Sequence, residues 1–474
     1  MKFQVLSHAG LSVTNNNGKQ LICDPWIIGS CYWRSWWNYP PVSRELVDSL
    51  NPDVIYITHI HWDHFHGPSL EKFPKDVKIV VPKGNYTRNI DDLYSLGFKN
   101  VYEIKHGETY KIDDEFEITS YQFGVFLDSA PLIECDGITL LNLNDSKHMG
   151  PTLKQIKRRH KDIDFVFRSH SSANSRMSYE IVDDPEEVVD DVERYIDEFA
   201  LTARAVGAKY AVPFASNHCH LHKDSWKYNH VVQTPQMVKD HFDKNGITSP
   251  ELRIMLSGDS WDAQIGFHQD TKDWFQNREE LLEQYREDQS AKLQKFYETE
   301  DNTKLSLKFV QNYYKNLSKK IPFFLKRRIK DAWFTHVLYA KDKPAFVFNI
   351  NVTSGQVDHL SADVNLDFET YPIQIHTTAF IFKRSIAFRI FSHMSIGKRV
   401  FYKVKKSHKP KLELLNLIYN LEEYDMIPLM SNFSKRSIET WRLRYREIIL
   451  YMMLAKDKLI HGKMDFKKYL KPIS

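Results

Sequence analysis

Four residues within six positions could bind a metal ion: His59, His61, Asp63 and His64. Imidazole nitrogens and a carboxylate suit zinc, iron or manganese. The alternative, a polar loop that is histidine-rich by chance, is the weaker explanation of such close spacing. A bound metal would bring the pKa of a water molecule near neutrality, and Asp63 is well placed to orient or deprotonate that water. The motif therefore predicts metal-dependent hydrolysis, although the same ligands could hold two irons and support oxygen chemistry.

Other loops must complete this site. Asp145 ends the apolar run 138–143, and a carboxylate at a strand end could bridge two metals. Its alternative role is an aspartate that closes an Asx turn. A second histidine-rich segment follows the predicted strand 210–213 and contains His218, His220, His222 and, a little beyond, His230. We expect His218 or His222 to supply a ligand.

Three further residues are candidates for substrate contact, namely His170, Asp128 and Trp37. His170 leaves the predicted strand 164–167, and its alternative role is structural. Five tryptophans close to the motif in sequence could form the wall of a pocket or could pack the edge of a sheet. They are Trp26, Trp33, Trp36, Trp37 and Trp62.

The elements that position the motif follow from the pattern of apolar residues. The run Val54–Ile57 directly precedes it and is typical of a buried strand. Ligands on a loop that leaves such a strand are aimed by a rigid sheet. Residues 1–268 alternate short strands with helices, including an amphipathic helix predicted over 185–206. This order predicts a layered α/β metal-binding domain.

Residues 269–331 form a helical, highly charged linker in this interpretation, and residues 332–474 form a smaller α+β domain of unknown role. We expect strands at 373–382 and 385–391 within that domain. A basic cluster near the end of the linker could be a solvated helix end, or it could contact an anionic membrane surface or a phosphorylated partner. Its members are Lys326, Arg327 and Arg328.

The composition is that of an ordinary globular protein, with 474 residues, 42% hydrophobic and 27% charged. A net charge of +4 is too small to require nucleic acid, so we expect a small-molecule substrate. The four cysteines form no Cys-x-x-Cys pair, and the sequence shows neither a signal peptide nor a membrane span. We therefore expect a reduced, cytoplasmic protein, whose oligomeric state the sequence leaves open.

His-x-His-x-Asp-His after a strand resembles the metallo-β-lactamase fold superfamily. The flanking segments 8–10, 21–26 and 36–41 are similar to the metallo-β-lactamase-like part of the CMP-N-acetylneuraminate hydroxylase family, over roughly residues 5–265. The resemblance implies a four-layer αββα sandwich that carries its metals at one sheet edge. It also implies one or two divalent ions, zinc first, with iron or manganese as alternatives. The ligands would be His59, His61, His64 and Asp145, with Asp63 as ligand or base.

Two departures from the hydroxylase family matter. That family carries a Rieske iron–sulfur domain with a Cys-x-His and a Cys-x-x-His pair, and this sequence does not contain both pairs. We therefore expect no built-in entry for electrons. The family's middle-loop histidine ligand is also missing, since Phe126 stands near its position. Asp128 could replace it as an oxygen ligand, and otherwise the site would be mononuclear or degenerate.

Three functions follow from these observations. The first is a metal-dependent hydrolase that acts on a phosphorylated or nucleotide-linked sugar or on a phosphodiester. The second is a di-iron oxygenase that needs a separate electron donor. The third is a non-catalytic binding protein with a degenerate metal site.

Overall fold

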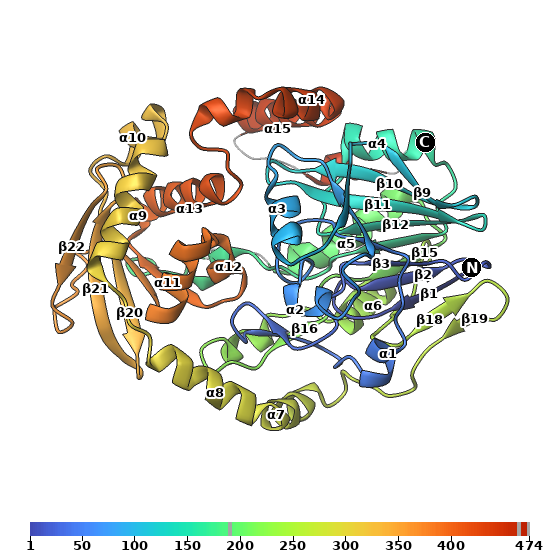
Figure 1. Ribbon diagram of the computed structural model, residues 1–474, viewed down its shortest axis with the longest axis horizontal. Helices are drawn as coiled ribbons and strands as arrows, with labels where there is room; N and C mark the ends of the chain where they lie inside the picture. Colours follow the sequence, from blue (N-terminus) through green and yellow to red (C-terminus); the bar gives the residue numbers. More distant parts are fainter. Residues whose placement is uncertain (188–191, 462–465, 472–474) are drawn as a thin grey trace.

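Two large β-sheets face each other in the computed structural model, which describes residues 1–187, 192–461 and 466–471 (Figure 1). The first sheet has the spatial order β19 (Gly266–His268), β18 (Ser260–Asp262), β1 (Lys2–Val5), β2 (Leu11–Thr14), β3 (Gln20–Cys23), β6 (Val54–Tyr56), β7 (Lys78–Pro82) and β8 (Asn100–Ile104). The second has the order β17 (Glu251–Leu252), β15 (Tyr210–Pro213), β13 (Phe165–Arg168), β12 (Ile138–Asn144), β11 (Asp128–Cys135), β10 (Phe116–Phe123) and β9 (Thr109–Asp113).

Apolar side chains fill the space between the two sheets. Phe3 of the first sheet meets Phe165 of the second edge-on, with ring centroids 4.8 Å apart. Separate apolar clusters join the outer face of each sheet to its helices. The helices on the first sheet are α1 (Arg44–Asp48), α2 (Gly67–Leu70) and α3 (Arg88–Ser95), and those on the second are α4 (Gly150–Arg159), α5 (Glu193–Val206) and α6 (Pro235–Lys244). This arrangement confirms the predicted αββα sandwich.

The strand before the metal-binding motif is buried on both faces, as its unbroken apolar run predicts. Val54 and Tyr56 point into the core between the sheets, whereas Ile55 and Ile57 face the outer helices. β6 pairs in parallel with β3 on one side and β7 on the other. The loop after β6 therefore leaves the carboxyl edge of a parallel segment. The predicted helix 185–206 is helical from Glu193, and its residues 188–191 lie outside the described part.

A third sheet and its helices form a second lobe, on the left in Figure 1. The sheet has the order β14 (Tyr179–Ile181), β24 (Val400–Val404), β23 (Ile373–Thr378), β20 (Phe334–Ala340), β21 (Lys343–Asn351) and β22 (Gln356–Leu360). Its helices are α9 (Leu307–Lys320), α10 (Phe323–Ile329), α11 (Ala379–Phe388), α12 (Phe391–Ile396) and α13 (Lys409–Glu423). Helices α7 (Arg278–Asp288) and α8 (Ser290–Asp301) run between sandwich and lobe. Because β14 comes from the earlier part of the chain, the lobe is not built from residues 332–474 alone.

The predicted strand at 385–391 is wrong, because helix α11 runs to Phe388 and helix α12 begins at Phe391. The predicted strand 373–382 likewise ends at Thr378, where helix α11 begins. The Thr378 hydroxyl accepts a hydrogen bond from the Ile381 backbone N–H and so caps the first turn. Ile386 follows Phe382 by four positions and Ile381 by five, which places all three on the face that packs into the lobe. A short run of apolar residues does not by itself distinguish such a buried helix from a strand.

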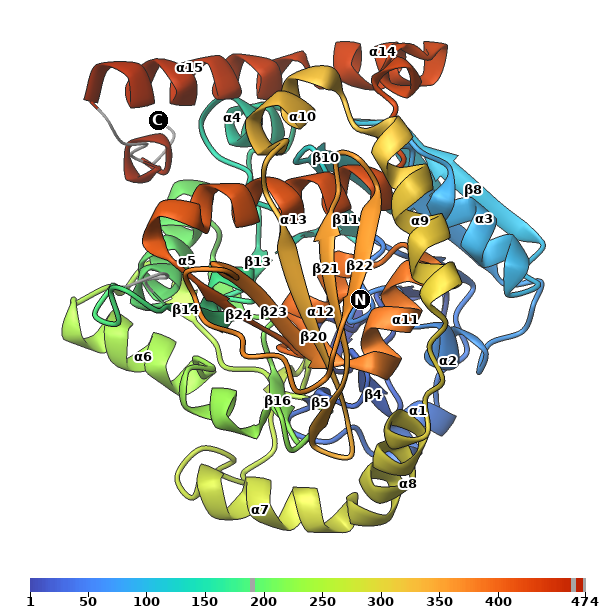
Figure 2. The ribbon, with the colours of Figure 1, turned by 90° about the vertical axis from the view of Figure 1, so that its left-hand side faces the viewer.

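The last two helices, α14 (Lys435–Leu443) and α15 (Tyr445–His461), return to the sandwich and lie at the top of Figures 1 and 2. Helix α15 packs against α4 through an apolar cluster that includes Leu450 and Met149. Beside this cluster, the Arg444 guanidinium donates to the Gly124 carbonyl at 2.6 Å. The Gly124 N–H donates to Glu447 at 2.9 Å. The end of the chain thereby fixes the loop that leads to Phe126 and Asp128.

No helix in the described residues is long and apolar enough to cross a membrane. The predicted basic cluster lies on α10, where Arg327 and Arg328 are exposed beside the exposed rings of Phe323 and Phe324. Contact of this cluster with an anionic surface stays a prediction. All four cysteines are free and buried.

Candidate metal centre

Asp24, which follows strand β3, anchors the metal-binding loop. This fully buried carboxylate accepts hydrogen bonds from the Thr58 N–H at 2.8 Å and from the Thr58 hydroxyl at 2.7 Å. It also lies 2.8 Å from Nδ1 of His64 and accepts from the Asn144 amide at 3.1 Å. A carboxylate on one ring nitrogen fixes the orientation of an imidazole and leaves the other nitrogen for a ligand. Asp24 therefore positions Nε2 of His64.

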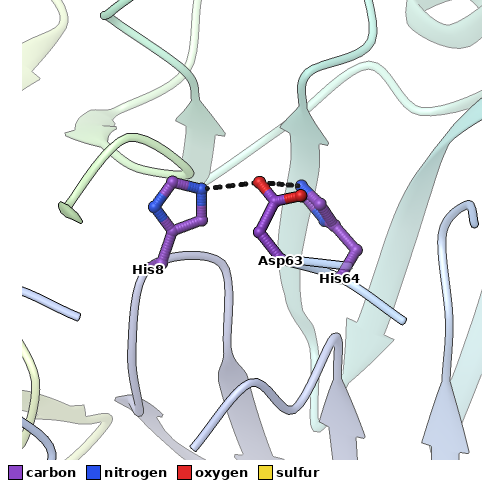
Figure 3. A group of neighbouring side chains, drawn as sticks. All are labelled: His8, Asp63 and His64. Atoms are coloured by element: carbon purple, nitrogen blue, oxygen red, sulfur yellow. Dashed lines mark ion pairs between the residues drawn. The ribbon is translucent and has the colours of Figure 1, made fainter. Parts of the chain in front are cut away.

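His64 belongs to two groups of side chains that could each hold a metal ion. One contains His59, His64 and Asp145, and the other contains His8, Asp63 and His64. Within each group the ligand atoms lie within 4.8 Å of one another. Nε2 of His64 is 3.3 Å from Asp145 and 3.5 Å from Asp63, and the same Asp63 oxygen is 3.1 Å from His8 (Figure 3).

The chemistry of this cluster fits a divalent cation. Burial lowers the pKa of His59 and that of His61 to about 4, so both rings are neutral and can act as ligands at neutral pH. Burial alone would lower the pKa of His64, but the charges of Asp63 and Asp24 outweigh it and raise that pKa well above its usual value. His64 thus holds a proton among carboxylates at a place where a metal could hold the same ligands. Two groups of nitrogen and oxygen donors suit zinc, iron or manganese.

His61 lies at the rim of this cluster. Its Nδ1 is 3.0 Å from Nε2 of His59, and its Nε2 is 3.2 Å from the hydroxyl of Tyr424, which comes from the second lobe. On the other side, the Tyr32 hydroxyl donates to one oxygen of Asp63. Residues from both lobes therefore hold the loop.

Of the predicted histidines of the later segment, His218 lies nearest the cluster. Strand β16 (His218–His220) pairs with β5 (Trp36–Asn38) in a small separate sheet with β4 (Ser30–Cys31). His218 stacks on Trp36, with ring centroids 3.7 Å apart and planes at 12°. Its centroid is 5.3 Å from that of His8. His218 is thus close to the second group without belonging to it.

The structure places the other histidines of this segment elsewhere. His222 lies beyond the end of β16 and turns toward α8, where its Nε2 is 3.2 Å from Glu300. Arg399 binds the same carboxylate. His220 lies 3.1 Å from the hydroxyl of Ser35, and His230 is exposed. None of these three joins either group of potential ligands among the described residues.

A cavity of about 290 Å³ opens over the cluster. His8, Asp63, Asp145 and His218 line it from the sandwich, and Ile396 lines it from the second lobe. A neighbouring cavity of about 270 Å³ shares the His61 and Asp128 side chains and is bounded by Tyr424 and Asn416 of the lobe. The second lobe therefore forms part of the wall of the site.

Of the three predicted substrate contacts, only Asp128 lines a cavity at the site. Asp128 lines both cavities, and burial raises the pKa of its carboxyl group to about 6. Trp37 points away from the site toward α7, and its ring centroid is 5.9 Å from that of Tyr285. Its neighbour Trp36 lines the cavity over the cluster. His170 is buried behind the lining.

Phe126, at the position of the expected middle-loop histidine, lies beside the second lobe. Its ring centroid is 5.0 Å from that of Tyr424. It lines the neighbouring cavity rather than the one over the cluster. In this chain the position supplies an aromatic contact between the lobes instead of a nitrogen ligand.

His8 and Asp24 stand in the segments that resemble the family, but the sequence does not identify them as members of the site. A signal was present, because each follows a short apolar strand, as Asp145 does. Nothing in the sequence alone shows that the ends of β1, β3, β6 and β12 meet at one place.

Parts of this chain are similar in sequence to known proteins. Residues 2–125 match the family model described as a beta-lactamase superfamily domain. A Mycolicibacterium smegmatis protein, provisionally named a Rieske 2Fe-2S iron–sulfur protein, is 27% identical over 47% of this chain and 44% of its own length. The cytidine monophosphate-N-acetylneuraminic acid hydroxylase of Mus musculus is 29% identical over 30% of this chain. The match spans only 25% of that hydroxylase.

Among solved structures, isothiocyanate hydrolase from Delia radicum gut bacteria covers 55% of this chain and 99% of its own, at 18% identity and a TM-score of 0.41. The sandwich, the donor cluster and the family match agree with one another. Residues 2–125 are therefore similar to the beta-lactamase superfamily domain, and over these residues the match confirms the resemblance predicted from the metal-binding motif.

Proposed function

We propose that the protein is a metal-dependent hydrolase of the metallo-β-lactamase superfamily. The observation that carries this proposal is the pair of donor groups that share His64, beside a cavity lined by His8, Asp63 and Asp145. His59, His64 and Asp145 would hold one metal ion, and His8, Asp63 and His64 lie where a second could bind. When bound, zinc supplies a water molecule whose pKa is near neutrality.

The residues of the chain then act on protons and on the substrate. Tyr32 donates to one oxygen of Asp63, which leaves the other oxygen, between His8 and His64, as the one that would hold a metal or orient a water and take its proton. Lys147 stands exposed at the cavity and offers a positive charge to an anionic group. Tyr195 offers a flat surface nearby. This lining supports a phosphorylated or nucleotide-linked sugar, or a phosphodiester, as the substrate.

Elemental analysis of protein purified without added metal is the first test. We expect zinc or manganese bound in stoichiometric amount, and hydrolysis of bis(p-nitrophenyl) phosphate that a chelator abolishes and zinc restores. His64→Ala should remove both the metal and the activity. The matched control is His359→Ala, at an exposed histidine on β22. A His64→Ala protein that keeps full metal content and full activity would refute the proposal.

A di-iron oxygenase with a separate electron donor is the second candidate. The sequence similarity to a hydroxylase named for CMP-N-acetylneuraminic acid favours it. The same analysis separates the two, because bound iron with a visible absorption band indicates oxygen chemistry and colourless zinc indicates hydrolysis. Protein that contains no metal after purification and binds none when zinc is added would instead indicate the third function, a binding protein with a degenerate site.

A further inference from the structure

A second, larger cavity of about 570 Å³ lies behind the metal-binding loop. Successive residues of the loop face opposite ways, since His61 and Asp63 line the cavity over the donor cluster whereas Ile60 and Trp62 line this one. The second lobe closes it with Ile390 and His393. The volume falls in the range of small-molecule binding sites. We call it the rear cavity.

Aromatic rings form much of the wall of the rear cavity. Trp33 and Trp62 meet edge-on with centroids 5.0 Å apart, and Tyr32 is stacked with Trp62 at 6.2 Å. Phe296 of α8 and Phe388 of α11 add rings from outside the sandwich. Such a lining favours a ligand with a flat apolar body.

The backbone that carries part of this wall is strained. Tyr32, Trp33 and Arg34 have φ values of 49°, 55° and 66°, so three successive residues other than glycine adopt the left-handed conformation. This conformation is unfavourable for residues that carry a side chain. Strain of this kind persists where the surrounding structure enforces it, often at functional sites. Here it places the Tyr32, Trp33 and Arg34 side chains together at one cavity.

Arg34 brings a positive charge to this cavity. Its guanidinium is half-buried and donates to the Ser30 hydroxyl at 3.0 Å, and it forms no ion pair with any residue in the described ranges. Arg399, by contrast, is buried against the carboxylates of Glu300 and Asp224. A desolvated guanidinium without a carboxylate gains from an anionic group placed in the cavity.

His393 supplies a second polar anchor. The residue is 1% exposed, and its Nδ1 lies 3.1 Å from the buried carboxylate of Glu423. Its Nε2 is buried and makes no hydrogen bond within the described part of the chain. Because a carboxylate on Nδ1 holds the proton there, Nε2 is the nitrogen that can accept a hydrogen bond. A buried acceptor of this kind calls for a donor on a ligand.

From these observations we propose that the rear cavity binds a small amphipathic anion. Its flat apolar body would lie among the rings of Trp33 and Trp62, and its carboxylate or phosphate would pair with Arg34. A hydroxyl or N–H group of the ligand would donate to His393. This site needs none of the metal ligands, so it is separate from the proposed hydrolase function.

The test uses 6-hydroxy-2-naphthoate as the probe and 6-hydroxy-2-naphthamide as its uncharged counterpart. Binding to the full chain is measured by calorimetry and by quenching of tryptophan fluorescence, in chelator-treated and in zinc-loaded protein. We expect the acid to bind about tenfold more tightly than the amide, which corresponds to about 1.4 kcal/mol. The zinc content should leave this ratio unchanged.

Two variants and one control locate the binding. Arg34→Gln should weaken the acid about tenfold and leave the amide within about twofold. His393→Phe should weaken both probes, because it removes the acceptor for their hydroxyl group. The control is Arg44→Gln, at an exposed arginine on α1, and it should change neither affinity.

Three results would overturn the proposal. They are no binding of the acid below about 1 mM, equal affinities of acid and amide, or equal effects of the Arg34 and Arg44 substitutions. If Arg34→Gln does not fold, the comparison of acid with amide on the unaltered protein decides alone.

Discussion

Replacing Asp24 by asparagine should weaken metal binding although Asp24 touches no metal ligand atom. One oxygen of this carboxylate accepts the Thr58 backbone N–H, and the other faces the Thr58 hydroxyl, His64 and Asn144. In the variant, the amide oxygen must face the Thr58 backbone N–H, because that group can only donate a hydrogen bond. The amide NH₂ then faces Nδ1 of His64, which must accept, so the ring proton moves to Nε2 and blocks the ligand atom.

The substitution should lower both the metal affinity and the free energy of unfolding. Loss of a partner that orients a metal-binding histidine typically lowers metal affinity by about 10–100-fold, or about 1.4–2.7 kcal/mol. The NH₂ group of the variant also opposes the Asn144 amide, so that two donors meet in a fully buried place. We therefore expect the metal-free variant to lose about 2 kcal/mol of unfolding free energy as well.

The assay is competition for zinc with a chromophoric chelator, paired with urea unfolding of the metal-free protein. The control is Asp53→Asn, which replaces a carboxylate that binds Lys19 and the Gln20 backbone near the surface. We expect the control to bind zinc as the unaltered protein does. Zinc affinity of Asp24→Asn within about twofold of the unaltered protein would show that Asp24 does not govern the orientation of His64.

Three further substitutions test contacts within the second lobe and at the helices that return to the sandwich. Burial lowers the pKa of His336 to about 4 from an unfolded value of 6.5, so the unfolded chain takes up this proton first and the residue lowers stability as the pH falls from 6.5 to 4. Between pH 7 and pH 4, His336→Leu should lose about 3 kcal/mol less unfolding free energy than the unaltered protein, measured by urea titration, and equal losses would contradict the assignment. Arg444→Met leaves the buried Glu447 without its cation and should cost about 3–5 kcal/mol in the same assay, whereas the double replacement with Glu447→Gln should recover part of it. Thr378→Ala removes the cap on Ile381 and should cost about 1 kcal/mol, and an unchanged unfolding curve would show that the cap does not stabilise α11.

The sequence predicts the sandwich and its loop well because the signals are local. His59, Asp63 and His64 stand within a few positions of one another, directly after an apolar strand, and the fold keeps them together. Asp145 was predicted on the same grounds, as a carboxylate at the end of a strand, and it reaches His64.

The missed features depend on contacts distant in sequence. Trp36 and Trp37 differ only in which face of β5 they occupy, and that choice is set by the pairing of β5 with β16. His222 follows two histidines on β16, yet the chain has turned away by that position and meets Glu300, 78 residues later. Tyr424 reaches His61 across 363 residues, which no local pattern signals.

The donor groups and the second-lobe residues that line the cavities come from different parts of the chain. The donor groups come from residues up to Asp145, whereas Ile396 and Tyr424 shape the cavities from far later in the chain. Substitutions in the lobe can therefore change which substrate enters while the metal ligands stay as they are. The lobe is nevertheless not a continuous segment of the chain, because the edge strand Tyr179–Ile181 of its sheet comes from the middle of the sandwich sequence. Any recombination event that swaps the lobe must bring this three-residue strand with it.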